Sequence, residues 1–453
     1  MHVAEKTGDN YDFDSIESLL INIEYRLNST SSNWRLCAIN DVINLCKTED
    51  QYILAVIVQS KAFERYSTMY FSEPSSLMMK AYTNIISNSQ EITAYFIQEG
   101  LLSSLYECLL SNSDENISSS LNCLYNISIS SLFSRLCMIC THFVDIALVF
   151  LTHYPKLKNV QLLSKLSYNL LSYFLYMESL DIEFPLSYDH ISGFDIEYLE
   201  LLMRENVLCL FENSIYPYLN KLLHYRNSSV AYYSMFSLLL FVRQGGFYMF
   251  MLDTSIFEDC AILLSYDYWQ LHDIILRFLI TMGIGLNGQC IDVFDKYGLF
   301  NIVFRLSYNS ESSQVRSQCY LCICNYLSYD VTRIENYITN SWLIEMDDRI
   351  KNFVFSEKSE LISLLANVII EIPIISSQIF QFNNIVEAYI SILFGTDNGI
   401  IEIILKSIAE IQSIKCSSFQ VLLNCGIERV LEEVRETASL KNALIIEKII
   451  SLF

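Results

Sequence analysis

Five asparagines recur at the same place in an apolar helical phrase, where a side-chain amide could hold a peptide backbone. The phrase reads SLNCLYNIS at 120–128, and its relatives are MKAYTNIIS at 79–87 and SKLSYNLLS at 164–172. Asparagine carries a donor and an acceptor in one side chain, so an evenly spaced row can pair with an extended peptide without reading its side chains. The alternative is that each asparagine makes a local hydrogen bond between helices. The candidate peptide-binding residues are Asn84, Asn126, Asn169, Asn325 and Asn367.

Two other patterns resemble cofactor or metal sites. GIGLNG at 283–288 matches the glycine pattern of a dinucleotide site, which requires a strand before it. The phrase before it, IILRFLITM, predicts a helix, so we interpret the glycines as a loop between repeats. Cys137, Cys140 and His142 could ligate zinc, but a structural zinc needs four ligands and no second half-site has matching spacing. We therefore expect buried helix cysteines there and in the run Cys319, Cys322 and Cys324, and neither a metal nor a cofactor.

The asparagine phrases belong to a repeat of long period. The first four anchors, from Asn44 to Asn169, lie 40 to 43 residues apart, and Asn325 and Asn367 lie 42 apart. Phrases without asparagine (SMFSLLLFV, IILRFLITM, LKSIAEIQS and LIIEKIISLF) continue the spacing, which gives about ten units. A period near 42 residues predicts an all-α fold, a right-handed α-solenoid superhelix.

Each unit has a common internal plan. Gly100, Gly298 and Gly426 lie 25 to 27 residues before their anchors, and each precedes an apolar helix, a polar turn and the anchor helix. The residues three before and one after an anchor share one helical face, so they predict a continuous core. The first set is Ala81, Cys123, Leu166, Cys322 and Leu364, and the second is Ile85, Ile127, Leu170, Tyr326 and Val368.

This order of glycine, apolar helix, polar turn and an ALxNLS-like helix resembles the armadillo repeat over residues 15–453. The two separated runs of asparagine resemble importin-α, a family of nuclear-import adaptors. That resemblance implies a concave groove with a major peptide site at the first three asparagines and a minor site at the last two. Importin-α has Trp four residues before each asparagine, where this chain has Lys80, Asn122, Lys165, Leu321 and Ser363. The two lysines predict a ligand that is less rich in lysine than an import signal.

Composition limits the partners and the compartment. The formal charge is −22, from 51 acidic and 29 basic residues, so nucleic acid is repelled and basic protein partners are favoured. The N-terminus lacks the cationic start and apolar core of a signal peptide. The most apolar segment, 361–380, carries Asn367, Glu371 and Pro373, which favours a buried helix over a membrane span. Fourteen cysteines without a regular framework indicate reduced thiols. We expect a cytoplasmic monomer that the import resemblance would also place in the nucleus.

The sequence predicts one long domain with an irregularity. Residues 1–14 are expected to form an acidic tail and residues 15–453 a single solenoid. Asn169 and Leu239 are 70 residues apart, which places an insertion at about 177–203 between repeats four and five. Such a segment can carry function or be a tolerated surface insertion.

No residue set predicts catalysis, because the six histidines are scattered and no nucleophile elbow is present. We expect a non-enzymatic adaptor that holds extended peptides. The alternative is a cytoplasmic armadillo scaffold or regulatory subunit that assembles a protein complex.

Overall fold

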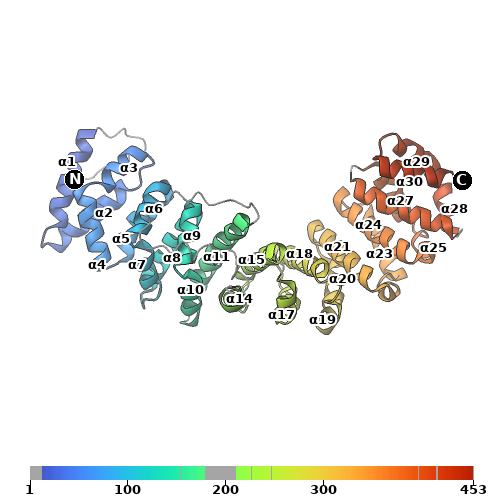
Figure 1. The fold of residues 1–453 in the computed structure, drawn as a ribbon, viewed down its shortest axis with the longest axis horizontal. Helices are drawn as coiled ribbons and strands as arrows, with labels where there is room; N and C mark the ends of the chain where they lie inside the picture. The colour runs from blue at the N-terminus through green and yellow to red at the C-terminus, as the bar shows by residue number, and fades with distance from the viewer. Residues whose placement is uncertain are drawn as a thin grey trace. The chain divides into compact units, whose positions relative to one another are not determined.

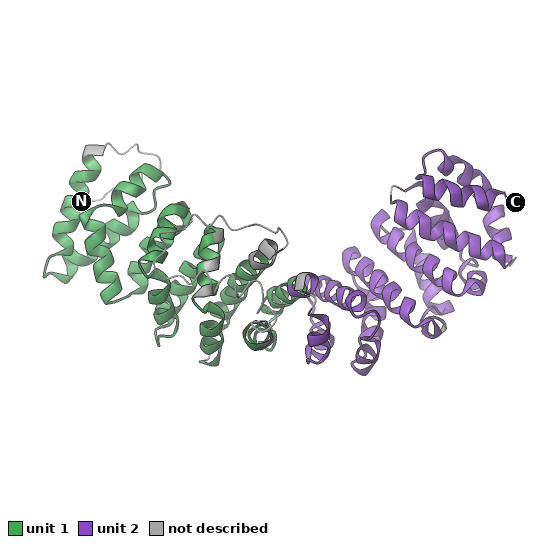
Figure 2. Ribbon diagram, in the orientation of Figure 1, with its two compact units in different colours: residues 1–240 green, residues 241–453 purple. Residues whose placement is uncertain are grey.

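The computed structural model describes residues 13–451, apart from residues 154, 179–210, 226, 246, 396 and 415–416. Every regular element in this described part is a helix, which confirms the predicted all-α class (Figure 1). The chain divides into two compact units, residues 1–240 and residues 241–453 (Figure 2). Most of the predicted acidic tail and of the predicted insertion at 177–203 lies outside the described residues.

Unit 1 is built from successive groups of two or three helices that correspond to the predicted repeats. The first group has two helices, and the next three groups have three each. The elements are α1 (Phe13–Leu27) and α2 (Ser32–Leu45); α3 (Gln51–Val58), α4 (Lys61–Ser72) and α5 (Ser76–Asn88); α6 (Gln90–Gln98), α7 (Leu101–Leu109) and α8 (Asp114–Ser130); α9 (Leu132–Cys140), α10 (Phe143–Thr152) and α11 (Leu157–Glu178); and the π-helical turn η1 (Phe211–Ile215), α14 (Tyr216–Leu223) and α15 (Ser228–Gly245).

Unit 2 continues the same plan. Some of its groups include a short 3-10 turn beside the first helix. The elements are α16 (Tyr248–Leu252), α17 (Ile256–Leu263) and α18 (Trp269–Gly285); α19 (Ile291–Lys296), α20 (Leu299–Asn309) and α21 (Ser313–Tyr329); η2 (Val331–Arg333), α22 (Ile334–Tyr337), α23 (Asn340–Ile350) and α24 (Phe355–Glu371); η3 (Pro373–Ile375), α25 (Ser376–Ile379), α26 (Asn383–Ser391), η4 (Ile392–Phe394) and α27 (Asn398–Ser413); and α28 (Ser417–Asn424), α29 (Ile427–Arg435) and α30 (Leu440–Ile450).

The last helix of each group is called here its ladder helix. The ladder helices of the described residues are α2, α5, α8, α11, α15, α18, α21, α24, α27 and α30, which agrees with the predicted ten repeats. In unit 1, α5 contacts α2 and α8, and α8 also contacts α11. In unit 2, each ladder helix from α18 to α30 contacts the next one. Contact between successive repeats is the defining property of a solenoid, so this part of the fold prediction is confirmed.

Side-chain caps fix where the ladder helices begin. A serine or aspartate at the N-cap accepts a hydrogen bond from a backbone N–H of the first turn, which would otherwise lack a partner. Ser113, for example, accepts from the N–H of Asn116 at the start of α8. The same arrangement is found at Ser75, Ser312, Asp397 and Ser439. In these five repeats the polar turn is therefore a helix-start signal, whereas α2, α18 and α24 begin without a side-chain cap hydrogen bond.

A left-handed backbone residue precedes the middle helix of several repeats. Gly100, Gly298 and Gly426 have φ angles of 94°, 65° and 79°, and each is the N-cap of its helix. A Cβ atom disfavours this conformation, which explains why glycine opens these units. In repeat four the same position is taken by His142, with φ of 57°, a case that the search for glycine overlooked.

The predicted core positions form the interior. All ten residues of the two sets named above are at most 5% exposed, which confirms the prediction. The segment 361–380 is buried in its first half, where Leu361, Leu364 and Leu365 of α24 are fully buried, whereas Ile374, after the end of α24 at Glu371, is 70% exposed. Within the described residues no single helix is long and apolar enough to cross a membrane, and one bent pair, Phe133–Ile139 with Phe143–Thr152, has the length and composition of a broken span.

Candidate functional site

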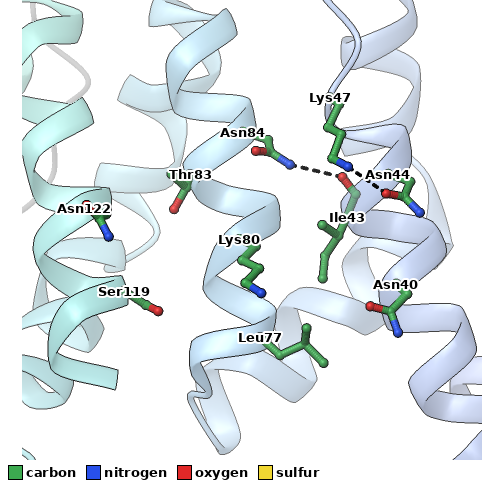
Figure 3. Close-up of a pocket in the computed structure, with 10 residues that line it drawn as sticks. All are labelled: Asn40, Ile43, Asn44, Lys47, Leu77, Lys80, Thr83, Asn84, Ser119 and Asn122. Atoms are coloured by element: carbon green, nitrogen blue, oxygen red, sulfur yellow. Dashed lines mark hydrogen bonds between the residues drawn. The ribbon is translucent and has the colours of Figure 1, made fainter. Parts of the chain in front are cut away.

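A groove runs over the first three ladder helices of unit 1. It has a volume of about 390 Å³ and takes its lining from α2, α5 and α8 (Figure 3). Most of the lining is uncharged and polar, as amide and hydroxyl groups outnumber the apolar side chains. We call it the lysine groove, and its lining residues are Asn40, Ile43, Asn44, Lys47, Leu77, Lys80, Thr83, Asn84, Ser119 and Asn122.

Asn84 lines this groove and is bound to the preceding repeat. Its Nδ2 donates to the carbonyl oxygen of Ile43, on α2, at 3.1 Å (Figure 3). The side chain is half-buried, and its Oδ1 makes no hydrogen bond within the described residues. One amide group therefore fastens two ladder helices together and still presents an acceptor.

The next two asparagines reach back in the same way. Asn126 Nδ2 donates to the carbonyl oxygen of Thr83 at 3.4 Å, and Asn169 Nδ2 donates to Ser128 Oγ at 3.3 Å. Both side chains are half-buried. The three asparagines of unit 1 thus occupy one phase of successive ladder helices, and their donors serve the joints between repeats.

The asparagines of unit 2 behave differently. Asn367 Nδ2 donates at 2.9 Å to the carbonyl oxygen of Ser363, within its own helix. The backbone carbonyl of Asn325 accepts from Ser328 Oγ at 2.7 Å. The Asn367 side chain also forms a hydrogen bond with the Cys324 side chain on α21, so it too reaches the preceding ladder helix. Peptide binding by the five asparagines stays a prediction, and the acceptors of the two runs differ.

Charge distinguishes the groove from the rest of the chain. Its charged lining residues are Lys47 and Lys80, both exposed, and no acidic residue lines it. Lys47 Nζ donates to Asn44 Oδ1 at 2.9 Å. The nearby carboxylate of Asp41, on α2, is already paired with Arg26 at 2.7 Å. A chain of net charge −22 therefore has a locally positive groove.

The cationic character continues to α11 through Lys165. Its ammonium group lies 5.8 Å from the centre of the Tyr233 ring, a cation–π geometry.

The positions four residues before the anchors include two lining residues, Lys80 and Asn122. Two other lining residues were not predicted: Asn40, on α2, and Lys47, in the turn that follows α2. Each lies about one helical turn from Asn44, so the 3.6-residue period was the signal that could have identified them.

Asparagine also joins repeats outside the groove. Asn88 Nδ2 donates to the carbonyl oxygen of Thr48 at 3.0 Å, and Asn442 Nδ2 donates to that of Asn398 at 3.1 Å. Asn88 does not line the groove. Asn88 lies four residues after Asn84, outside the anchor phase, so it makes the same kind of joint at a position where no peptide contact is predicted.

The remaining sequence motifs lie in the scaffold. The predicted loop at 283–288 is confirmed only in its second half: residues 283–285 form the end of α18, and the turn after it contains Asn287 and Gly288, both with positive φ angles. Cys137, Cys319 and Cys322 are buried, as expected for core cysteines, whereas Cys324 is half-buried. No cluster of three or more His, Cys, Asp or Glu residues in the described part of the chain could hold a metal ion.

Comparison with solved structures finds similar folds at low sequence identity. A crystal structure of an engineered protein is 17% identical, with a TM-score of 0.66, over 96% of this chain and 99% of that one. A second engineered protein has 15% identity and a TM-score of 0.34, over 68% of this chain and 97% of its own. A designed armadillo repeat protein has 13% identity and a TM-score of 0.45, over 52% of this chain and 98% of its own.

No protein-family model and no curated protein matches the sequence. The engineered protein with a TM-score of 0.66 supports the fold. The order of the helices within each repeat of this chain shows which kind of solenoid it is. The chain is an α-solenoid of armadillo-like repeats.

Proposed function

We propose that this chain is a non-enzymatic scaffold that binds an extended peptide segment of a partner protein along the ladder helices of unit 1. The lysine groove is the observation that carries the proposal, because it crosses three successive repeats and is lined by polar groups rather than by a closed apolar pocket. Extended peptides bind best where main-chain hydrogen-bond partners recur along a line.

The spacing of the ladder helices suits an extended chain. Packed helices lie about 8–10 Å apart, and an extended peptide advances about 3.3 Å per residue, so each repeat corresponds to about three peptide residues. The Oδ1 atoms of Asn84 and Asn126 can each accept a peptide N–H, since their Nδ2 groups are bound to the scaffold. Recognition is then directed at the backbone and at its donors.

A nuclear-import adaptor and a cytoplasmic scaffold or regulatory subunit are the two forms that this function could take. Lys47 and Lys80 in the groove favour the scaffold, since a lysine-rich import signal would bring like charges together there. A monomer in the cytoplasm is part of the same proposal.

The test uses a fluorescein-labelled peptide of about twelve residues, four repeats long, with Gln at every third position and Ser, Gly and Ala between. Replacing Asn84 and Asn126 together by Ala removes two acceptors, each worth about 0.5–1.5 kcal/mol. Fluorescence anisotropy should therefore show an affinity about 5- to 150-fold lower than that of the parent.

Asn88→Ala is the matched control. It removes the same kind of joint, the Nδ2 bond to the Thr48 carbonyl, but no groove residue. It should lower the melting temperature about as much as the substitution of Asn84 or of Asn126 alone and leave the affinity unchanged. No binding by the parent up to about 1 mM protein, or equal loss of affinity in Asn88→Ala and the double variant, would refute the proposal.

A further inference from the structure

We propose that the segment bound in the lysine groove is acidic, with carboxylates held by Lys47 and Lys80. This inference rests on the proposed function and specifies the chemistry of its ligand. It rests on the local charge of the ladder helices in unit 1, which differs from the net charge of −22 of the whole chain.

Acidic residues are few on these helices, and α2 carries only Asp41, which is paired with Arg26 at 2.7 Å. The helix α5 contains none, and α8 contains only Asp114 and Glu115, its first two residues. Asp114 is paired with Lys156, and Glu115 accepts a hydrogen bond from Ser76. In α11 no acidic residue precedes Glu178, the last residue of the helix. The cations of the groove are therefore not neutralised by ladder-helix carboxylates on that face.

Unit 2 provides the contrast. Its ladder helices carry Glu360 on α24 and Glu402 and Glu410 on α27. Glu410 occupies the anchor phase that asparagine occupies in unit 1. Positive character is thus a local property of the first ladder helices and does not follow from the repeat pattern.

The two groove lysines are available to a ligand. Lys80 makes no ion pair within the described residues, and Lys47 uses one donor on Asn44 Oδ1 and retains two. Lys80 lies on α5 and Lys47 in the turn that follows α2, the neighbouring ladder helix, so carboxylates about three residues apart on an extended peptide would reach both. A basic ligand would meet like charge there, and a long polyphosphate would be repelled by the net charge of −22.

The experiment compares three labelled peptides of about twelve residues that differ only at every third position, which is Glu, Gln or Lys. The parent should bind the Glu peptide most tightly and the Lys peptide least. Reversing both groove lysines, Lys47→Glu with Lys80→Glu, should weaken the Glu peptide about 3- to 30-fold, as expected for two exposed charge pairs, and leave the Gln peptide nearly unchanged. Added salt should weaken the Glu peptide selectively.

Lys61→Glu with Arg65→Glu is the control, because both are exposed residues of α4 outside the groove and the change in net charge is the same. The neutral pair Lys47→Gln with Lys80→Gln gives a second variant in case the reversed one fails to fold. Equal binding of the Glu and Gln peptides, tightest binding of the Lys peptide, or equal loss in the α4 control overturns the inference but leaves the scaffold function standing. Tighter binding of single-stranded oligothymidylate than of the Glu peptide also overturns it. Failure of all three peptides to bind overturns both proposals.

Discussion

Arg316 and Glu357 join two ladder helices of unit 2, α21 and α24, through a buried ion pair. Arg316 Nε lies 2.5 Å from Glu357 Oε1 and Nη2 lies 2.9 Å from Oε2, while Glu357 is 0% exposed. Arg316 Nη1 also donates to the carbonyl oxygens of Ser310 at 2.6 Å and Glu311 at 3.1 Å. Arg316→Met leaves a buried carboxylate without its counter-ion, so unit 2 should lose about 3–5 kcal/mol of unfolding free energy.

The assay needs a local probe, because the repeats of a solenoid need not unfold together. Trp342, on α23, is buried, whereas Trp34 and Trp269 are about half exposed. Replacing the two exposed tryptophans by Phe leaves Trp342 as the reporter of repeat eight. With a urea dependence of about 1–3 kcal/mol per molar, the fluorescence midpoint of Arg316→Met should fall by at least about 1 M.

Two further variants decide the cause. Arg316→Met with Glu357→Leu replaces the pair by apolar groups and should recover most of the loss, since such replacements are often neutral. Lys358→Met removes a cation that makes no ion pair in the described structure, from the same helix, and should hardly move the midpoint. A midpoint for Arg316→Met no lower than that for Lys358→Met would refute this account, as would a double variant no more stable than the single one.

Two other predictions concern ionisable groups. Burial raises the pKa of Cys46 and of Cys123 to about 12, so both thiols should resist DTNB at pH 8 while the exposed Cys37 and Cys425 react. Mass spectrometry of the labelled peptides measures the order of reaction. Early labelling of Cys123 would contradict the prediction. Burial, with a contribution from Asp397, raises the pKa of Glu360, so the folded state loses stability as the pH rises through that pKa. Glu360→Gln should therefore have a higher free energy of unfolding than the parent at pH 7 and the same free energy below about pH 4. Urea unfolding at the two pH values measures both. Equal stability of the variant and the parent at pH 7 would count against the prediction.

The helix order could be predicted because one interaction repeats. Each repeat buries the same two phases of its ladder helix, for example Ala81 and Ile85, so a fixed spacing of apolar residues around each asparagine identified the helix and its inner face. Glycine at Gly100 and Gly298 marked a left-handed turn for a steric reason that a single residue type reveals.

The site was predictable only in part. The sequence placed Asn84 and Asn126 on one phase, but which group of the amide faces the scaffold depends on where the preceding carbonyl lies after the helices pack. Lys47 was overlooked because it follows its anchor, Asn44, rather than preceding it. His142 has the positive φ angle of the glycines that open other repeats, but it is not a glycine. Only its separation in sequence from the anchor Asn169 could have indicated this position.

The direction of the asparagine joints bears on how the chain is made. In unit 1, Asn84, Asn126 and Asn169 each donate to an acceptor that lies earlier in the sequence, 41 to 43 residues toward the N-terminus. When a ladder helix leaves the ribosome, the group that it must bind has already been synthesised, and no joint of this kind waits for a later repeat. Because domains tend to fold from the N-terminus during synthesis, each new repeat can dock on a finished template. At these three joints, a nascent chain interrupted between repeats would expose carbonyl or hydroxyl oxygens that water can satisfy.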